Sequence, residues 1–163
     1  MSYLTNPFPN DPDRGPIWTM LVERDIDAFI SQDWGMVDGD FIKEGFTGIH
    51  AHKSDNPDSW RIGFPDLGTY REEWLRQAAE SAKVEYAEDQ RTGIFRATSL
   101  QHIEIEGERA VAHKKFDGTI ALAGGGQEVL NWQTLYFLRK VSGAWKLSGF
   151  IGYMPFPMGT RKA

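Results

Sequence analysis

Apolar side chains recur at helical spacing near the start of the chain. In residues 16–32 they include Trp18, Val22 and Phe29, which are separated by one or two helical turns. This spacing predicts a helix with one buried face. Asp13 precedes it and is a residue type that caps helix N-termini, so we predict that Asp13 caps this helix.

A second amphipathic helix is predicted from Tyr70 to about Lys83, with Trp74 on its apolar face. Thr69 and Glu72 have the spacing of a capping box, which predicts that this helix begins at Thr69. The other apolar positions alternate with polar ones or form short runs between turn residues, a pattern typical of strands. These strands are predicted near residues 43–52, 60–64, 95–106, 109–117, 128–141 and 144–153.

The order of these elements is helix, hairpin, helix and then four strands. Helices that are separated in sequence from an antiparallel sheet indicate an α+β fold, in which a curved, mostly antiparallel sheet wraps around the N-terminal helices. We expect an irregular N-terminal arm at residues 1–15, one domain at 16–154 and a tail at 155–163.

Composition removes several function classes. The 163 residues include no Cys, so disulfides and thiolate catalysis are excluded. The formal net charge is −5 and the basic residues are scattered, which argues against nucleic acid as a partner. No apolar run is long enough for a membrane span, and we expect no signal peptide and a cytoplasmic location. Aromatic residues make up 13% of the chain, which favours an apolar pocket for a small molecule.

Four passages carry a resemblance to a known superfamily. They are QDWGMVDGDF followed by EGFTGIHAH, then TYREEWLRQA, HIEIEGERAVAHKKF and TLYFLRKVSGAWKLSGFIGY. In this order they resemble the nuclear transport factor 2-like superfamily, which includes ketosteroid isomerases, SnoaL-type polyketide cyclases, scytalone dehydratase and a dehydrochlorinase. The resemblance implies a cone-shaped, cystatin-like roll, a pocket between the first helix and the concave sheet face, and a homodimer formed through the outer face of the sheet.

His50 is the first candidate for a catalytic group. The resemblance places it at or next to the Asp that abstracts protons in the ketosteroid isomerases, and a His is a competent general base near neutral pH. Asp25 interrupts the apolar face of the first helix, near positions where relatives keep a helix Tyr or Asp. We predict that Asp25 orients His50 as a dyad. The alternatives are a hydrogen-bonded His at the pocket rim and a solvated Asp.

Other residues are predicted to line the pocket. His52 shares a strand face with His50, and Gln133 is predicted on the concave face by alternation. His113 is the next candidate base, followed by His102, although both also suit structural positions. The aromatic wall is predicted to comprise Trp18, Trp60, Phe64, Tyr70, Trp74 and Trp132.

These residues suggest an enzyme that abstracts a proton from an apolar or aromatic small molecule, as a lyase, isomerase or cyclase. It would need no cofactor, and we predict no metal site. A non-catalytic binding domain and an assembly subunit on the same fold remain open alternatives.

Overall fold

The computed structural model of the chain describes residues 5–159. The first four residues of the expected arm and the last four of the expected tail therefore lie outside the described residues. The helices are α1 (Arg14–Trp18), a π-helix η1 (Thr19–Arg24), α2 (Asp25–Ser31), α3 (Leu67–Ala82) and α4 (Gln90–Ala97), with short 3-10 turns η2 (Trp34–Met36), η3 (Asp38–Asp40) and η4 (Pro57–Ser59).

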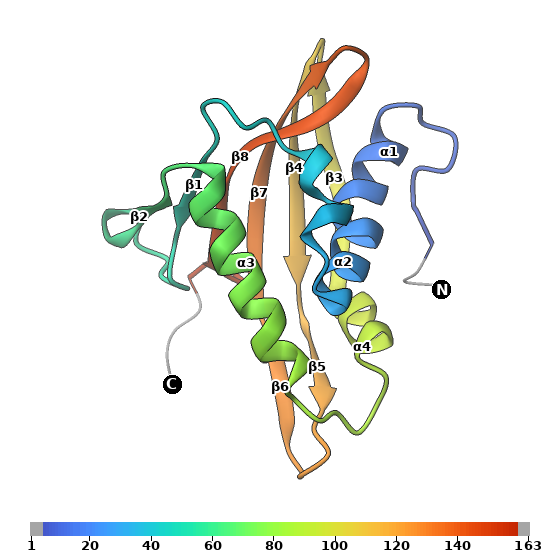
Figure 1. Cartoon of the computed structure of the whole chain (residues 1–163), viewed down its shortest axis with the longest axis vertical. Helices are drawn as coiled ribbons and strands as arrows, with labels where there is room; N and C mark the ends of the chain where they lie inside the picture. Colours follow the sequence, from blue (N-terminus) through green and yellow to red (C-terminus); the bar gives the residue numbers. More distant parts are fainter. Residues whose placement is uncertain (1–4, 160–163) are drawn as a thin grey trace.

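A six-stranded sheet forms the other layer of the molecule. Its strand order is β2-β1-β8-β7-β4-β3, and every neighbouring pair is antiparallel except β1 and β8, which are parallel. A separate two-stranded hairpin, β5-β6, extends beyond one end of the sheet (Figure 1). The strands are β1 (Thr47–His50), β2 (Arg61–Phe64), β3 (Thr98–Glu106), β4 (Arg109–Phe116), β5 (Gly118–Ala121), β6 (Gln127–Leu130), β7 (Trp132–Val141) and β8 (Ala144–Pro155).

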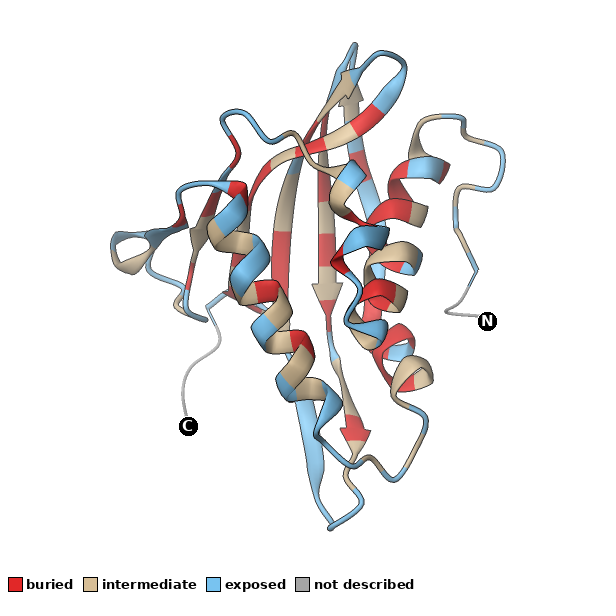
Figure 2. Ribbon diagram, viewed as in Figure 1, coloured by how far each residue is buried: buried red, intermediate tan, exposed pale blue. Residues whose placement is uncertain are grey.

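The helices α2, α3 and α4 lie on the same side of the sheet (Figure 1). We call this side the helix-covered face and the opposite side the outer face. Residues of β4 alternate strictly between the two, because successive side chains of a strand point in opposite directions. Ala110, Ala112, Lys114 and Phe116 are buried under the helices, and the residues between them are more exposed (Figure 2). This arrangement confirms the predicted α+β fold with helices packed on one face of the sheet.

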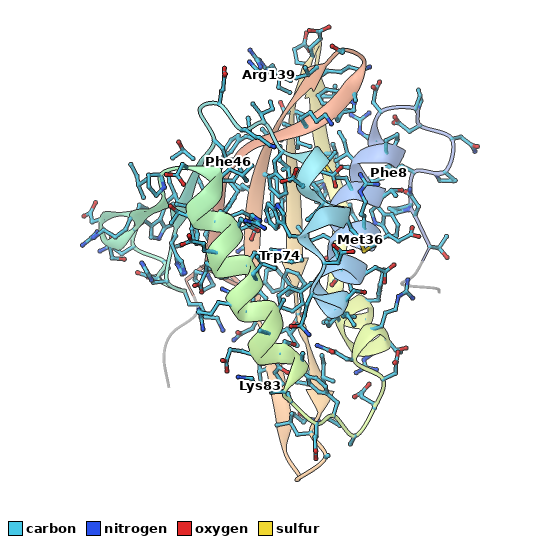
Figure 3. All side chains as sticks on the ribbon, viewed as in Figure 1. Phe8, Met36, Phe46, Trp74, Lys83 and Arg139 are labelled. Atoms are coloured by element: carbon cyan, nitrogen blue, oxygen red, sulfur yellow. The ribbon has the colours of Figure 1, made fainter. Side chains whose placement is uncertain are left out.

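Two apolar cores hold the layers together. One joins α1, η1 and α4 to β3, β4 and the start of β8, and contains Trp18, Leu21 and Phe95. The other lies under α3 and contains Trp74 and Phe46. Figure 3 shows Trp74 between α3 and α2, where its ring contacts Phe29 edge to face.

The predicted helix caps were wrong. The Asp13 side chain does not cap α1 and instead accepts hydrogen bonds from Lys140 and Trp145, while Asp11 binds the amides of Asp13 and Arg14. Helix α3 begins two residues before Thr69, and Asp66 accepts the amide of Thr69 at 2.8 Å. A carboxylate is a stronger acceptor than a hydroxyl, so the Asp acts as the cap.

The strand predictions were right in type and wrong at several boundaries. The run predicted as a strand from residue 95 begins with the end of α4, and the strand β3 starts only at Thr98. The long predicted strand 128–141 is divided at Asn131 into β6 and β7, because β6 pairs with β5 rather than with the main sheet. The glycine-rich stretch 124–126 joins β6 to β5, a short strand that was not predicted from the sequence.

Candidate functional site

A cavity of about 450 Å³ lies between the helices and the helix-covered face of the sheet. This volume is in the range of about 300–1,000 Å³ typical of small-molecule sites. Residues from α2, α3, α4, β4, β6, β7 and β8 line it, so it is enclosed by both layers of the fold. The aromatic side chains along its walls are Phe29, Tyr70, Trp74, Tyr86, Phe116, Trp132, Tyr136, Phe150 and Tyr153.

An ion pair lies in this largely apolar cavity. The Lys114 ammonium is 3.1 Å from Asp25 Oδ2, and the Lys114 side chain is only 1% exposed whereas that of Asp25 is 32% exposed. Lys114 Nζ also donates to the carbonyl oxygen of Leu21 at 2.5 Å. A buried ammonium is tolerated only with such partners, because removing it from water is costly.

The π-helix η1 explains how Leu21 can act as an acceptor. In a regular α-helix, the carbonyl of Leu21 would accept the amide of Asp25. Here the amide of Asp25 donates to the carbonyl of Val22 instead. The Leu21 carbonyl accepts Lys114, which reaches it from β4. The local winding of this helix and the register of the sheet together create the site, and π-helical turns are frequent at functional sites.

Tyr70, Tyr136 and Tyr153 are three of the four tyrosines that line the cavity. Burial, and then the negative charge of Asp25, raises the pKa of Tyr136 well above its ordinary value. Burial likewise raises the pKa of Tyr70 well above its ordinary value, and it raises that of Tyr153. The three phenols therefore keep their protons at neutral pH and can donate hydrogen bonds. Gln77 already occupies the hydroxyl of Tyr153 at 3.1 Å.

Of the predicted site residues, Asp25, Tyr70, Trp74 and Trp132 line the cavity. His50 does not. Among the hydrogen bonds of residues 5–159, none joins His50 to Asp25, whose side chain pairs with Lys114. The structure therefore does not bring the predicted dyad together.

His50 lies behind Tyr153, which lines the cavity. Its imidazole stacks on Tyr153 at 4.2 Å and on His52 at 4.0 Å between ring centroids. Its Nδ1 accepts the backbone amide of His52 at 3.0 Å. Burial lowers the pKa of His50, and the neighbouring charge of His52 lowers it further. His50 is thus a neutral ring that supports Tyr153, while His52 is exposed beside it.

Gln133 and His113 lie on the outer face, away from the cavity. Gln133 Oε1 is 2.6 Å from His113 Nε2, and its amide nitrogen donates to the carbonyl of Pro155 at 2.7 Å. The predicted concave position of Gln133 is therefore wrong: Trp132 and Thr134, on either side of it in β7, face the cavity. His102 pairs with His113 across the strands β3 and β4 and is exposed.

The other residues predicted for the aromatic wall, which are Trp18, Trp60 and Phe64, do not line the cavity. Trp18 is buried in the core under α1, and Phe64 is buried against Tyr70 and Phe150. Trp60 donates its indole N–H to the carbonyl of Ser54 at 2.9 Å and stands outside the cavity lining. Phe64 therefore packs against residues of the cavity wall, whereas Trp18 and Trp60 belong to other parts of the fold.

Lys114 and Tyr136 were not predicted from the sequence, although both line the cavity together with Asp25. A signal for Lys114 was present: it alternates with Ala110, Ala112 and Phe116, so it is a charged residue on an otherwise apolar strand face. Within residues 5–159, no group of three His, Cys, Asp or Glu side chains is arranged to hold a metal ion. In the same part of the chain, no helix is both long and apolar enough to cross a membrane.

Comparison with known proteins identifies the fold. No protein-family model matches this chain, and no curated protein matches it. An NTF2-like protein of unknown function from Pseudomonas putida KT2440 superposes with a TM-score of 0.57 at 15% identity, covering 90% of this chain and 89% of that one.

Two further solved structures have the same architecture. A domain of unknown function with a cystatin-like fold from Nostoc punctiforme has a TM-score of 0.56 at 12% identity, covering 88% of this chain and 78% of that one. An NTF2-like protein with a cystatin-like fold from Novosphingobium aromaticivorans has a TM-score of 0.54 at 12% identity, covering 91% and 84%. The chain therefore has a cystatin-like, NTF2-like fold, which is the fold predicted from its sequence.

Proposed function

We propose that this chain binds a small, flat, largely apolar molecule in the cavity and that Asp25 acts on it as a general base. The observation that carries this proposal is the Asp25–Lys114 ion pair in an aromatic cavity. A buried ion pair is a poor way to stabilise a fold, because apolar side chains of similar size often do so as well or better. A few polar groups in an otherwise apolar cavity of ligand size are typical of small-molecule sites, so these charges are better explained by a role in binding or chemistry.

The two oxygens of Asp25 have different surroundings. Oδ2 accepts the hydrogen bond from Lys114, whereas Oδ1 has no hydrogen-bond partner among residues 5–159. Lys114 thus fixes the carboxylate in position and leaves one oxygen able to accept a proton. A base held in this way is suited to abstract a proton from a carbon next to a carbonyl group.

Tyr136 is suited to stabilise the charge that such a step creates. When Asp25 takes the proton, the electron pair of the broken C–H bond moves to the carbonyl oxygen, which becomes an enolate. Tyr136 remains protonated at neutral pH and can donate a hydrogen bond to that oxygen. In a ligand with a C=C bond conjugated to the enolate, Asp25 returns the proton to the far carbon of that bond as the carbonyl re-forms, which gives isomerisation. In a ligand with a leaving group on the β-carbon, the enolate electrons expel that group as the carbonyl re-forms and Asp25 gives its proton to the departing group or to water, which gives elimination.

In this proposal the base is Asp25 rather than His50. His50 is separated from the cavity by Tyr153 and uses Nδ1 to accept the amide of His52. Binding without turnover remains the second candidate function, and the size and aromatic walls of the cavity favour it equally.

Exchange of ligand protons with solvent separates the two functions. Binding of 2-tetralone and 2-indanone would be measured by calorimetry, and loss of their α-protons in D₂O would be followed by proton NMR. We expect binding and accelerated exchange with the wild-type chain. Asp25→Asn should slow the exchange by about 10²-fold or more.

Asp27→Asn is the matched control, because Asp27 lies on the same helix and pairs with Arg91 at 2.6 Å outside the cavity lining. It should leave binding and exchange unchanged. Binding without exchange would reduce the function to that of a binding domain. If neither ketone binds, the proposal is wrong.

A further inference from the structure

Both cationic side chains that line the cavity already have carboxylate partners. Lys114 is paired with Asp25. Arg76 makes two hydrogen bonds to Glu73, at 2.8 Å and 2.5 Å. An anionic ligand would therefore find no unpaired cation among the described residues of the lining.

The acidic side chains of the lining are less well matched. Glu80 is 3.5 Å from Lys83, but both of these side chains are mostly exposed, so the pair is screened by water. Glu128, on β6, has no ion pair within residues 5–159. Its carboxylate accepts only the hydroxyl of Tyr86, at 2.5 Å. Burial, and then this hydrogen bond, raises the pKa of Tyr86 to about 12, so Tyr86 remains the proton donor.

Glu128 is exposed and belongs to the β5-β6 hairpin, which extends beyond the main sheet (Figure 1). Among the residues that line the cavity, Glu128 is exposed to solvent whereas Lys114 is buried. Tyr86, whose hydroxyl donates to Glu128, lines the same cavity. A carboxylate beside an aromatic ring is a suitable environment for an ammonium group, because both attract a positive charge.

We propose that the cavity selects a ligand with an aromatic body and a protonated amine, that Glu128 is the counter-ion of this amine, and that carboxylate ligands are rejected. The inference rests on the proposed function, since it requires that the cavity binds a small molecule, and it adds the charge class of that molecule. A ligand carboxylate entering the cavity would lose water and face Glu128 without gaining a cationic partner.

Three naphthalene probes with the same ring and different end groups test this inference. They are 1-naphthylmethylamine, 1-naphthalenemethanol and 1-naphthaleneacetate, the anion of 1-naphthaleneacetic acid. Each is titrated calorimetrically into the full chain at neutral pH. Because Glu128 is exposed, we expect the amine to bind about two- to fivefold more tightly than the alcohol, and the carboxylate to bind most weakly. Glu128→Gln should remove the preference for the amine and leave the affinity for the alcohol unchanged.

Glu85→Gln is the matched control, because Glu85 is an exposed acid next to Tyr86 that does not line the cavity. It changes the net charge equally and should leave the order of the three affinities unchanged. If the carboxylate binds best, or if Glu128→Gln leaves the affinity for the amine unchanged, the inference is overturned. If 2-tetralone binds and the amine does not, the inference fails while the proposed function stands. If none of these compounds binds, both fail.

Discussion

His50 with His52 and Asp25 with Lys114 are two pairs of neighbouring titratable residues, the first outside the cavity and the second in its lining. His50 and His52 are two positions apart in the sequence and stack on one another outside the cavity. Asp25 and Lys114 are 89 positions apart, yet they form an ion pair in the cavity lining. The sequence predicted that Asp25 pairs with His50, whereas in the structure Asp25 pairs with Lys114, through a contact that only the tertiary fold creates.

The largest expected effect comes from removing one member of the buried pair. Asp25→Leu leaves the Lys114 ammonium buried without its carboxylate, which should lower the free energy of unfolding by about 3–5 kcal/mol. The double variant Asp25→Leu with Lys114→Met should recover most of that loss. Urea denaturation would measure each value.

The ion pair of Asp27 with Arg91 provides the control for this prediction. Its side chains are 33% and 43% exposed, so Asp27→Leu should lower the free energy of unfolding by less than about 1 kcal/mol. An equal loss of unfolding free energy in Asp25→Leu and Asp27→Leu would contradict the prediction. It would show that leaving Lys114 without its partner costs no more than breaking a surface pair.

A smaller effect is expected from removing a tyrosine hydroxyl, and it should differ between Tyr136 and Tyr153. Tyr136→Phe removes the proposed donor to the enolate oxygen and should slow α-proton exchange by about 10²-fold while ketone binding persists. Tyr153→Phe removes a hydroxyl that is already bonded to Gln77, so it should change the exchange rate by less than about threefold. Equal rates in the two variants would contradict the role assigned to Tyr136.

The smallest effect concerns the stability contributed by His50. Because its pKa is lowered in the folded chain, the unfolded chain binds more protons. Stability should therefore fall as the pH is lowered through the ordinary His pKa of about 6.5. In His50→Asn this part of the fall should be absent. Urea denaturation at pH 7.5 and pH 5.5 would measure it.

His102→Asn is the control for the pH experiment, because His102 is exposed on the outer face. A pH dependence that is identical in the wild-type chain and in His50→Asn would show that desolvation of His50 contributes nothing to stability. In that case His50 would be more accessible to solvent than its stacking on Tyr153 implies.

The fold was predictable because its signals are local. Helical spacing in residues 16–32 and alternation in the C-terminal strands are properties of neighbouring residues, and they specified the two layers. The residues that line the cavity were harder to predict. Gln133 was assigned to the wrong face because one residue of error in strand alternation reverses every side chain.

The ion pair was hidden for a different reason. Lys114 is followed by Lys115, and two adjacent lysines in a strand resemble a solvated edge more than a buried site. Its burial depends on Asp25 and on the Leu21 carbonyl, which are brought to it by the packing of helix on sheet. Asp25 itself was identified because an acid on an apolar helix face is visible in the sequence.

The π-helix can also be regarded as an α-helix that carries one additional residue. An α-helix advances by about 100° for each residue, so deleting a residue within Thr19–Arg24 would rotate the segment after it by that angle relative to the segment before it. Either Trp18 would leave the core or Asp25 would turn away from Lys114. The wider turn therefore lets one continuous helical segment place Trp18 in the core and, seven residues later, the Asp25 carboxylate beside Lys114.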